Sequence, residues 1–596
     1  MKLIKTLSIG AIVILASCSA GPSVEEMQQR AIAEANAIYA DYFEGMHQFN
    51  PLRSTFMGER RFNGEFFPVI SAENREQRRQ FELSFLGKMK GIDPQFLIGQ
   101  HRLSYEVFMR DRQIALQGFD FPSYLLPINQ MSGVHNFIAQ LGSGQSAQPF
   151  ESLEDYRLFM SRARGFVEWL ASAKVAMQQG IEQGVVQPEI VVRKVLPQFE
   201  YHLVDNPEDS IFAGPLSNNQ LPAEQLAEIK AEYMALISDE IIPAYRSMYD
   251  FLLEDYLPAS RQNVGLSELP QGKDWYQYLI QVNTTLNKDP ESIHELGKKE
   301  VARILSEMNW VKEQINFAGD MPAFFEHLRT DEQYYFASTD EMVAAYDDVR
   351  EKINRLAPKL FNIFPRADYE VRLVEAFRAA SSAGASYQSP SVDGSRPGIF
   401  YINGYNLKAQ PKFLLETLSI HEASPGHHFQ ISIQQEINDI PDFRRFGGYS
   451  VFSEGWALYA ESLGKEMGLF TDPIMWYGRL VDEQLRAMRL VVDTGLHAKG
   501  WTREQAIQYM LDNSSMNETD VIAEVERYIV IPGQALSYKL GEFTIRGLRN
   551  EAEAALGENF DVKAFHTQIL KDGALPMPIL EAKVRQWIGS LQNTKN

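Results

Sequence analysis

Cysteine is nearly absent from this sequence, since Cys18 is the only one among 596 residues. The chain therefore forms no internal disulfide, and a metal cluster held by cysteines is excluded. Positive charge is also scarce relative to negative charge: 57 Lys and Arg face 78 Asp and Glu, and the formal net charge is −21. Because such a chain repels phosphate backbones, we expect no nucleic acid among its partners.

Long apolar runs and linkers are missing as well. After residue 18 no stretch of 18 apolar residues occurs, so no later segment is expected to span a membrane. No Pro/Gly/Ser-rich linker, low-complexity tract or internal repeat divides the chain. Hydrophobic residues make up 45% and charged residues 23%, which is ordinary for a globular protein with a large core.

The first residues have the features of an export signal. Lys2 and Lys5 precede an apolar run over residues 7–16, which is too short for a bilayer-spanning helix of about 20 residues. The run ends in Leu-Ala-Ser-Cys at 15–18, which resembles the lipobox of bacterial lipoproteins. In that class the signal is cut before the cysteine, and the cysteine carries a lipid.

We therefore predict a signal peptide at 1–17, a lipidated tether at 18–23 and a membrane anchor at Cys18. The protein would face the periplasm in a bacterial cell envelope, with the outer membrane as the first choice. A cysteine that merely sits in an ordinary signal peptide is the alternative.

Most of the remaining chain predicts helices. Apolar residues recur at spacings of three and four over 25–44, 153–179, 223–256, 292–314 and 340–356. Residues 369–374 and 384–403, which include the turn-rich Asp-Gly-Ser-Arg-Pro-Gly at 393–398, predict a small sheet. We expect a mainly α fold with that sheet beside the active site. Residues 24–270 would form an N-terminal helical part, and 271–596 the part that holds the chemistry.

A group of histidines follows the helical segment 413–420. His421 and Glu422 come first, and His427 and His428 follow at spacings of six and seven from His421. In the regular zincin pattern the two histidines are four residues apart on one helical face, with a glutamate beside the first. Here Pro425 occupies that fourth position, so the pattern is stretched.

A break in the helix at Pro425-Gly426 can compensate for this longer spacing. Pro425 cannot donate to the carbonyl of His421 and its ring clashes there, while Gly426 tolerates irregular backbone. A break or bulge would bring His427 back toward His421, whereas His428 would lie about 10 Å away along an unbroken helix. We favour His427 as the second ligand and keep His428 as the alternative, or as a neighbour of the ligands.

A carboxylate from another helix is expected to complete the site. Glu454 and Glu461 are seven residues apart, so they share one helical face. We assign Glu454 to the metal and Glu461 to the free ring N–H of a ligand histidine. His421, His427 and Glu454 would then hold one zinc ion, with Glu422 as the general base. A solvated helix end without a metal is the alternative.

Together these residues resemble a known family. The segments His-Glu-x-x-Pro-Gly-His-His-x-Gln at 421–430, Glu-Gly-Trp-Ala-Leu-Tyr-Ala-Glu at 454–461, the turn at 393–398 and Pro-Gly-Gln-Ala-Leu-Ser-Tyr-Lys at 532–539 are similar to a large bacterial family catalogued as domain of unknown function 885. That family is in turn similar to helical zinc peptidases of the thermostable carboxypeptidase and thimet oligopeptidase type. The resemblance implies a zincin-like fold of two helical lobes around a deep channel, with Glu454 as third ligand. The Pro-Gly insertion departs from that type.

Two segments offer a donor for the transition state. Over residues 480–499 five polar residues share one arc of an otherwise apolar helix: Asp482, Arg486, Arg489, Asp493 and His497. The arc either lines a cleft, where His497 would donate to the developing oxyanion, or forms a buried ion-pair ladder. Because peptidases of the resembled type use a Tyr or His for this purpose, Tyr538 is the stronger candidate.

Other residues could hold the substrate. Arg396, Lys539, Arg546 and Arg549 are candidates for a peptide's C-terminal carboxylate, which arginine binds through two parallel hydrogen bonds. For each of them a solvated surface base is the alternative. Residues Tyr401 and Asn403 end a predicted edge strand and would bind the substrate backbone by strand addition.

We therefore expect a zinc-dependent peptidase that cuts short peptides with metal-activated water, as a carboxypeptidase or oligopeptidase. A lipoprotein that binds peptide or metal without turnover is one alternative, although the candidate base Glu422 is present. A zinc hydrolase of a non-peptide amide is another. A serine hydrolase is disfavoured, because the chain has no Gly-x-Ser-x-Gly elbow.

Overall fold

The computed structural model describes residues 22–131, 133–217, 221–375, 379, 383–390 and 396–593. The predicted signal peptide, Cys18 and residues 393–395 of the turn-rich motif lie outside the described residues. Helices dominate and a small three-stranded sheet accompanies them, which confirms the predicted mainly α fold. Among the described helices, none has both the length and the apolar character needed to cross a membrane.

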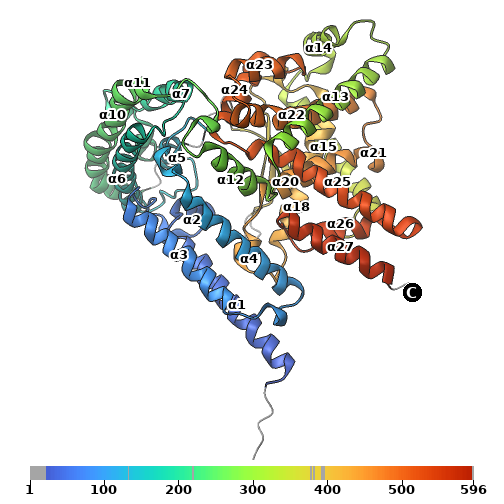
Figure 1. Ribbon diagram of the computed structural model, residues 1–596. Helices are drawn as coiled ribbons and strands as arrows, with labels where there is room; N and C mark the ends of the chain where they lie inside the picture. Colours follow the sequence, from blue (N-terminus) through green and yellow to red (C-terminus); the bar gives the residue numbers. More distant parts are fainter. Residues whose placement is uncertain are drawn as a thin grey trace, which may run out of the picture.

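The N-terminal helices, blue to green in Figure 1, lie on one side of the molecule, and the orange and red C-terminal helices lie on the other. The predicted helices at 25–44 and 153–179 are confirmed as α1 and α6. The helices of the N-terminal part are α1 (Val24–Met46), α2 (Pro51–Phe56), α3 (Ala72–Lys90), α4 (Gly99–Gln117), α5 (Val134–Gly142), α6 (Leu153–Gln183), α7 (Glu189–Glu200), α8 (Gly214–Ser217), α9 (Ala223–Ala235), α10 (Ile242–Phe251) and α11 (Leu257–Ala259).

Local chemistry explains the bounds of the longest helix of this part. The hydroxyl of Ser152 accepts from the backbone N–H of Asp155, and the carboxylate of Asp155 accepts from the backbone N–H of Ser152. This reciprocal pair is a capping box, and it starts α6. Gly184 ends it in the left-handed conformation, with φ of 69°. The predicted helix at 223–256 is also present, but π-helical turns at Leu236–Ile241 and Leu252–Tyr256 interrupt it.

The C-terminal part is likewise helical, and the helices predicted at 292–314 and 340–356 are confirmed as α13 and α15. Its helices are α12 (Gly272–Thr284), α13 (Pro290–Gln314), α14 (Met321–Thr330), α15 (Thr339–Leu356), α17 (Leu415–Leu418), α18 (His427–Gln435), α19 (Asp442–Arg445), α20 (Ser450–Ser462), α21 (Gly464–Met467), α22 (Pro473–Ala498), α23 (Arg503–Asp512), α24 (Glu518–Val530), α25 (Ser537–Leu556), α26 (Val562–Leu570) and α27 (Met577–Asn593).

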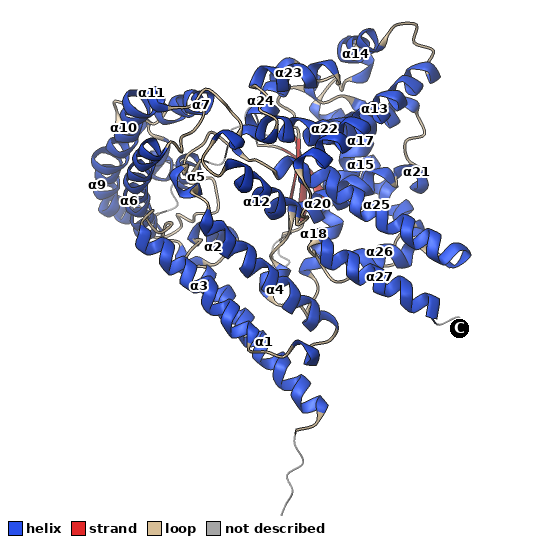
Figure 2. Ribbon diagram, viewed as in Figure 1, coloured by secondary structure: helices blue, strands red, loops and turns tan. Residues whose placement is uncertain are grey.

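The sheet forms where the sequence predicted it, and Figure 2 shows it in red among helices of the C-terminal part. It consists of β1 (Tyr369–Leu373), β2 (Ala385–Gln388) and β3 (Gly398–Ile402). Strand β3 lies in the middle, parallel to β1 and antiparallel to β2. All five residues of β3 are buried, as expected for an apolar strand covered on both faces. Tyr346 of α15 packs edge-on against Phe400, with ring centroids 5.3 Å apart.

The prediction of an edge strand at Tyr401 and Asn403 is wrong. Strand β3 is paired on both sides, so its backbone has no free edge to which a substrate strand could add. The Tyr401 hydroxyl donates to Glu375 at 3.3 Å, and the buried Asn403 amide donates to the carbonyl of Ala379 at 2.7 Å. Both side chains therefore serve contacts within the protein.

One hydrophobic core crosses the predicted boundary at residue 270. The largest cluster of buried apolar residues includes Phe166 and Tyr245 from the N-terminal part. The same cluster includes Tyr477 and Met488 of α22 from the C-terminal part. Helix α22 therefore packs against both parts of the chain.

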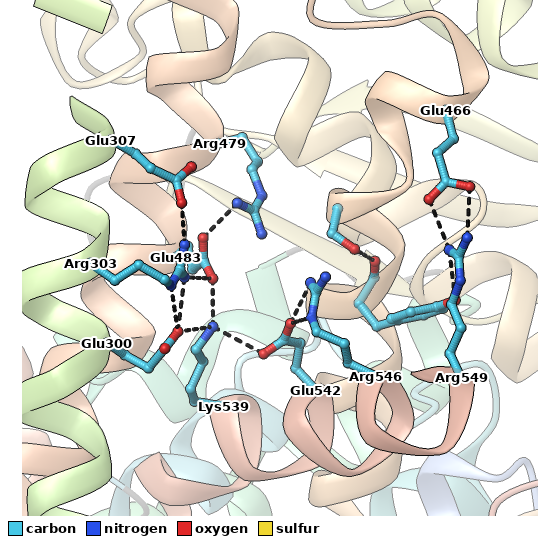
Figure 3. Close-up of polar contacts among 12 residues, drawn as sticks. Glu300, Arg303, Glu307, Glu466, Arg479, Glu483, Lys539, Glu542, Arg546 and Arg549 are labelled. Carbon is cyan, nitrogen blue, oxygen red and sulfur yellow. Dashed lines mark hydrogen bonds and ion pairs between the residues drawn. The ribbon is translucent and has the colours of Figure 1, made fainter. Parts of the chain in front are cut away.

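A network of ion pairs joins α13, α22 and α25 (Figure 3). At its centre, the ammonium of Lys539 lies 2.5 Å from Glu483, 2.9 Å from Glu542 and 3.3 Å from Glu300. The side chains of Lys539, Glu483 and Glu542 are each only 1% exposed. Although burial alone would lower the pKa of Lys539, the three carboxylates raise it above its ordinary value. The ammonium therefore stays charged and fixed.

This network overturns one predicted substrate contact. Lys539 cannot hold a peptide carboxylate, because its ammonium is enclosed by three carboxylates of the protein. Arg546 pairs with Glu542 in the same network but remains partly exposed, so its substrate role stays a prediction. Arg549 pairs with Glu466 at 2.8 Å, on the right in Figure 3.

Replacing Lys539 with methionine should destabilise the protein strongly. The change leaves buried carboxylates without their cation, which costs about 3–5 kcal/mol. Urea unfolding of Lys539→Met measures this loss. The matched control is Lys298→Met, whose partner Glu295 is about half-exposed, and it should change stability by no more than about 1 kcal/mol. Equal effects in the two variants would contradict the structural role of the network.

Candidate metal centre

The backbone breaks between the two histidine segments, as the Pro-Gly step predicted. Helix α17 passes into a π-helical turn at Ser419–Ala423, which carries His421 and Glu422. Ser424 is extended, with φ of −121° and ψ of 133°, and helix α18 starts at His427. The irregular turn and the new helix start together replace the single regular helix of the zincin pattern.

Gly426 lets the chain double back closely. A Cβ atom on this residue would lie 2.0 Å from the carbonyl oxygen of His421 and 2.2 Å from that of Ile420, so no other residue fits without movement. The buried Trp456 of α20 donates from Nε1 to the carbonyl of Pro425 at 2.7 Å. This bond fixes the break against the helix that carries the third candidate ligand.

The three predicted ligands converge. His421 Nε2 lies 3.5 Å and His427 Nε2 lies 3.4 Å from the same oxygen, Glu454 Oε2. The two imidazole rings are nearly perpendicular, with centroids 4.8 Å apart. Two ligand atoms about 2.0–2.1 Å from one zinc ion in a tetrahedral shell are about 3.4 Å apart. The observed spacings match that value and exceed the usual 2.7–3.2 Å of a hydrogen bond to nitrogen.

The chemistry of the donor set also suits a cation. Glu454 Oε2 and His427 Nδ1 are buried and lack a hydrogen-bond partner among the described residues. Burial alone would raise the pKa of Glu454, but His427 and His421 lower it well below its ordinary value, so this carboxylate is ionised at neutral pH. The side chains of His427 and Glu454 remain 12% and 19% exposed, which leaves the centre open to solvent on one side.

Glu461 makes the contact predicted for it. His421 Nδ1 and Glu461 Oε1 are 2.7 Å apart, a hydrogen-bond distance that orients the ring and directs Nε2 toward Glu454. Asp482 of α22 lies beyond Glu461, and the three groups form a second compact set. Burial, with the nearby charge of Asp482, raises the pKa of Glu461 to about 7. Of the three groups, His421 and Glu461 are joined by the 2.7 Å contact, and Asp482 pairs with Arg486.

The candidate base Glu422 directly follows the first candidate ligand. It occupies the same π-helical turn as His421 and is half-buried. Its side chain makes no hydrogen bond to any residue that the structure describes, so its oxygens are not committed elsewhere. Burial, with the charge of Glu422, raises the pKa of Tyr346.

The predicted place of His428 beside the ligands is wrong. Its Nε2 lies 3.1 Å from the carbonyl of Ala367, and its Nδ1 lies 3.0 Å from the hydroxyl of Tyr387 on β2. Helix α18 starts between the two histidines, so adjacent side chains point to different faces. His427 faces the centre and His428 faces the sheet.

Tyr538 lies next to the arginines of α22, one of which pairs with Asp482. The guanidinium carbons of Arg486 and Arg489 lie 5.5 Å and 4.5 Å from its ring centroid. Arg486 pairs with Asp482, which links Tyr538 to the contact behind His421. Tyr538 is 8% exposed and makes no side-chain hydrogen bond within the described part of the chain. Its hydroxyl is therefore available to a ligand.

His497 does not reach the centre. Its Nδ1 accepts from the backbone of Leu266 at 3.1 Å, and its Nε2 lies 2.9 Å from the carbonyl of Tyr528. It is 15 residues beyond Asp482 on the same helix, about 22 Å away. The predicted catalytic role of His497 is wrong. The ladder interpretation holds for this end of α22, where the carboxylate of Asp493 pairs with the hydroxyl of Tyr276.

Backbone carbonyl groups hold the side chain of Arg396. Its guanidinium donates to the carbonyls of Ser389 at 2.7 Å and Pro397 at 3.1 Å. These contacts tie the start of β3 to the end of β2. A contact between Arg396 and substrate stays a prediction.

The family model for a bacterial protein of unknown function, DUF885, matches residues 51–584. The chain belongs to this family. The predicted membership of the DUF885 family is thereby confirmed. No curated protein matches the chain.

Solved structures resemble this DUF885 protein over nearly its whole length. A protein of Colwellia psychrerythraea, described as a candidate lipoprotein, is 29% identical and superposes with a TM-score of 0.86, covering 94% of this chain and 100% of its own. A second candidate lipoprotein, of unknown function, from Shewanella oneidensis is 18% identical with a TM-score of 0.72, covering 94% and 99%. The second likeness shows the shared fold.

Sequence reasoning missed two contacts that shape the centre. Trp456 had no assigned role, although it stands two residues after Glu454 in the Glu-Gly-Trp segment. Gly455 and Gly541 had none either, yet a Cβ on Gly455 would lie 2.4 Å from the Cα of Gly541. These glycines let α20 and α25 cross in close contact, which brings Glu454 and Tyr538 to neighbouring turns. The sequence signal for this close helix crossing was a glycine near a candidate site residue in each of the two helices.

Substituting Gly426 should disrupt the centre. In Gly426→Ala the new methyl group collides with two carbonyl oxygens, and we expect a loss of about 1–3 kcal/mol together with weaker zinc binding. Urea unfolding and zinc titration measure the two effects. Gly547→Ala is the control, since a Cβ there meets nothing within 4 Å, and it should be neutral or slightly stabilising in α25. Unchanged zinc affinity in Gly426→Ala would contradict the account of the break.

Proposed function

We propose that this DUF885 protein is a zinc-dependent peptidase. The observation that supports this most directly is the convergence of two imidazole nitrogens on one oxygen of Glu454, at 3.4 and 3.5 Å. His421, His427 and Glu454 would hold one zinc ion and leave the fourth place of a tetrahedral shell for substrate chemistry. Zinc supplies a Lewis acid there, which polarises a carbonyl and acidifies water.

The protein's own side chains supply the proton transfer and the charge stabilisation. Glu422 takes the proton of the attacking water and passes it to the leaving amine, since its carboxylate is free of other partners. The Tyr538 hydroxyl donates to the oxygen that becomes negative in the tetrahedral intermediate. Glu461 holds the His421 ring in place through Nδ1. Arg486 and Arg489 fix the orientation of the Tyr538 ring.

Short peptides are the proposed substrates, cut in the manner of a carboxypeptidase or an oligopeptidase. The ligand side chains are at most 19% exposed, which suits flexible peptides better than folded proteins. We further propose that a lipid on Cys18 anchors the protein in the cell envelope, facing the periplasm. The described candidate lipoprotein from Colwellia psychrerythraea, 29% identical over its full length, supports this part.

Mutations should distinguish the proposed base, Glu422, from the proposed metal ligand, Glu454. Glu422→Gln should bind about one zinc per chain and cleave no peptide, because residue 422 moves a proton and holds no metal. Glu454→Gln should lose zinc and activity together. Metal analysis and digestion of a peptide library with both variants and the wild type test this. Equal cleavage by the wild type and Glu422→Gln would remove Glu422 from the mechanism. Zinc binding without cleavage by the wild type would favour a peptide- or metal-binding lipoprotein or a hydrolase of another amide.

Tyr538→Phe should slow the chemical step without affecting zinc. Loss of one donor to a developing oxyanion costs about 2.7–4 kcal/mol, so kcat should fall about 10²- to 10³-fold with little change in KM. Steady-state kinetics on a peptide from the library gives both constants. The control is Tyr509→Phe, which removes a phenol hydroxyl from α23 and should leave kcat unchanged. A fall confined to KM would assign Tyr538 to substrate binding instead.

A further inference from the structure

A second concave site lies away from the metal centre, where the N-terminal helices meet the segment that leads into α20. The cavity has a volume of about 280 Å³. Its walls come from α1, α2, α4 and α19 and from Gly447, Gly448 and Tyr449, and none of the candidate metal ligands lines it. The volume is close to the lower end of small-molecule sites, which begin at about 300 Å³.

The charge of this cavity is opposite to that of the chain. Three guanidinium groups line it, from Arg53, Arg112 and Arg444, against one carboxylate, Asp111. Asp111 is already engaged, since it accepts from the hydroxyl of Tyr449 at 2.7 Å and from Arg110 at 3.0 Å. Arg53 is exposed and Arg112 also pairs with the buried Glu82, yet cations still outnumber carboxylates around the cavity. In a protein with a net charge of −21, this local excess of cations suits an anion.

Two of these guanidinium groups have N–H groups to spare. Arg112 has a side chain only 9% exposed, and its Nη1 has no hydrogen-bond partner among the described residues. Its Nε pairs with the carboxylate of Glu82 at 3.2 Å, and its guanidinium carbon lies 3.8 Å from the centroid of the Tyr42 ring, so the group is held in place. Arg444 is 4% exposed, and within the described part of the chain its Nε has no partner, while its other nitrogens bind Gln100, Ser104 and the carbonyl of Asp572.

Leaving such N–H groups unpaired is costly. A buried charged donor without an acceptor loses its hydration without compensation. Burial lowers the pKa of Arg112 to about 9 and also lowers that of Arg444. A bound anion would add a counter-charge beside these two cations.

The remaining wall is apolar. Phe43 and Met46 of α1, Val107 of α4 and Phe443 of α19 face the same cavity. A bare inorganic anion would leave this surface without a partner. Two spare N–H groups suit the two oxygens of a carboxylate, and the apolar wall suits a hydrocarbon substituent.

We propose that this cavity binds a small carboxylate that carries an apolar group. The carboxylate lies against Arg112 and Arg444, and the apolar group lies against Phe43, Met46 and Phe443. The site connects to the metal centre through the chain itself, because Tyr449 precedes α20 and Glu454 stands in its second turn. The proposal does not depend on peptidase activity.

Calorimetric titration with 3-phenylpropionate tests this site, with 3-phenylpropionamide as the neutral isostere and inorganic phosphate as the bare anion. The wild type should bind the acid and not the amide, both with zinc and after its removal by a chelator. Arg112→Met should weaken binding at least about tenfold, since a charge-assisted hydrogen bond is lost. Arg110→Met is the control: it removes a guanidinium two residues earlier that does not line the cavity, and it should leave the dissociation constant unchanged.

A second variant tests the cavity without removing a charge. Gly448 lines it, and a Cβ there meets nothing within 4 Å, so Gly448→Leu should fold normally and block the ligand. Loss of binding in this variant supports the proposal even if Arg112→Met fails to fold. Equal affinity for acid and amide, tighter binding of phosphate than of the acid, unchanged binding in Gly448→Leu, or binding that vanishes when zinc is removed would each overturn it.

Discussion

The break at Pro425-Gly426 is the constraint on which the candidate metal centre depends. A regular helix would separate His421 from His427 by nearly two turns, and the ligand set could not form. The close packing of Gly426 against the carbonyls of Ile420 and His421, together with the bond from Trp456 to Pro425, turns the chain back on itself. Two imidazoles then face one carboxylate oxygen at the separation that a shared ion requires. The stretched motif and the regular zincin motif thus reach a similar ligand geometry by different backbones.

The charged residues of the C-terminal part divide into groups with different tasks. Around Lys539, the carboxylates of α13, α22 and α25 enclose a buried ammonium and hold three helices together. Around Asp482, charges connect Glu461 and the His421 ring to the arginines that pack on Tyr538. Helix α22 contributes to both groups from different faces. A helix that spans the core can therefore set both the position of a candidate catalytic side chain and the stability of the lobe.

The candidate metal centre and the cavity at α1, α4 and α19 have opposite electrostatic character. At the candidate metal centre, Nε2 of two imidazoles faces the unpaired Oε2 of Glu454, as suits a cation. At the junction of α1, α4 and α19, guanidinium groups converge with N–H groups unpaired, as suits an anion. In both places the unpaired polar atoms are buried, where leaving them unsatisfied is most costly. That cost is the physical reason for assigning a ligand to each.

The sequence by itself determined most of the helices, the small sheet and the candidate ligand set, because apolar periodicity and the residue types of the motif act locally. It also located the break, since proline and glycine restrict or free their own backbone wherever they stand. Only the tertiary structure decided that β3 is a central strand, that Lys539 is enclosed by carboxylates and that His497 is tied to backbone far from the centre. Those outcomes depend on which distant segments pack against each residue, and no spacing within one helix or strand encodes that. Whether a charged residue faces a cleft or a buried partner is a property of the assembled helices.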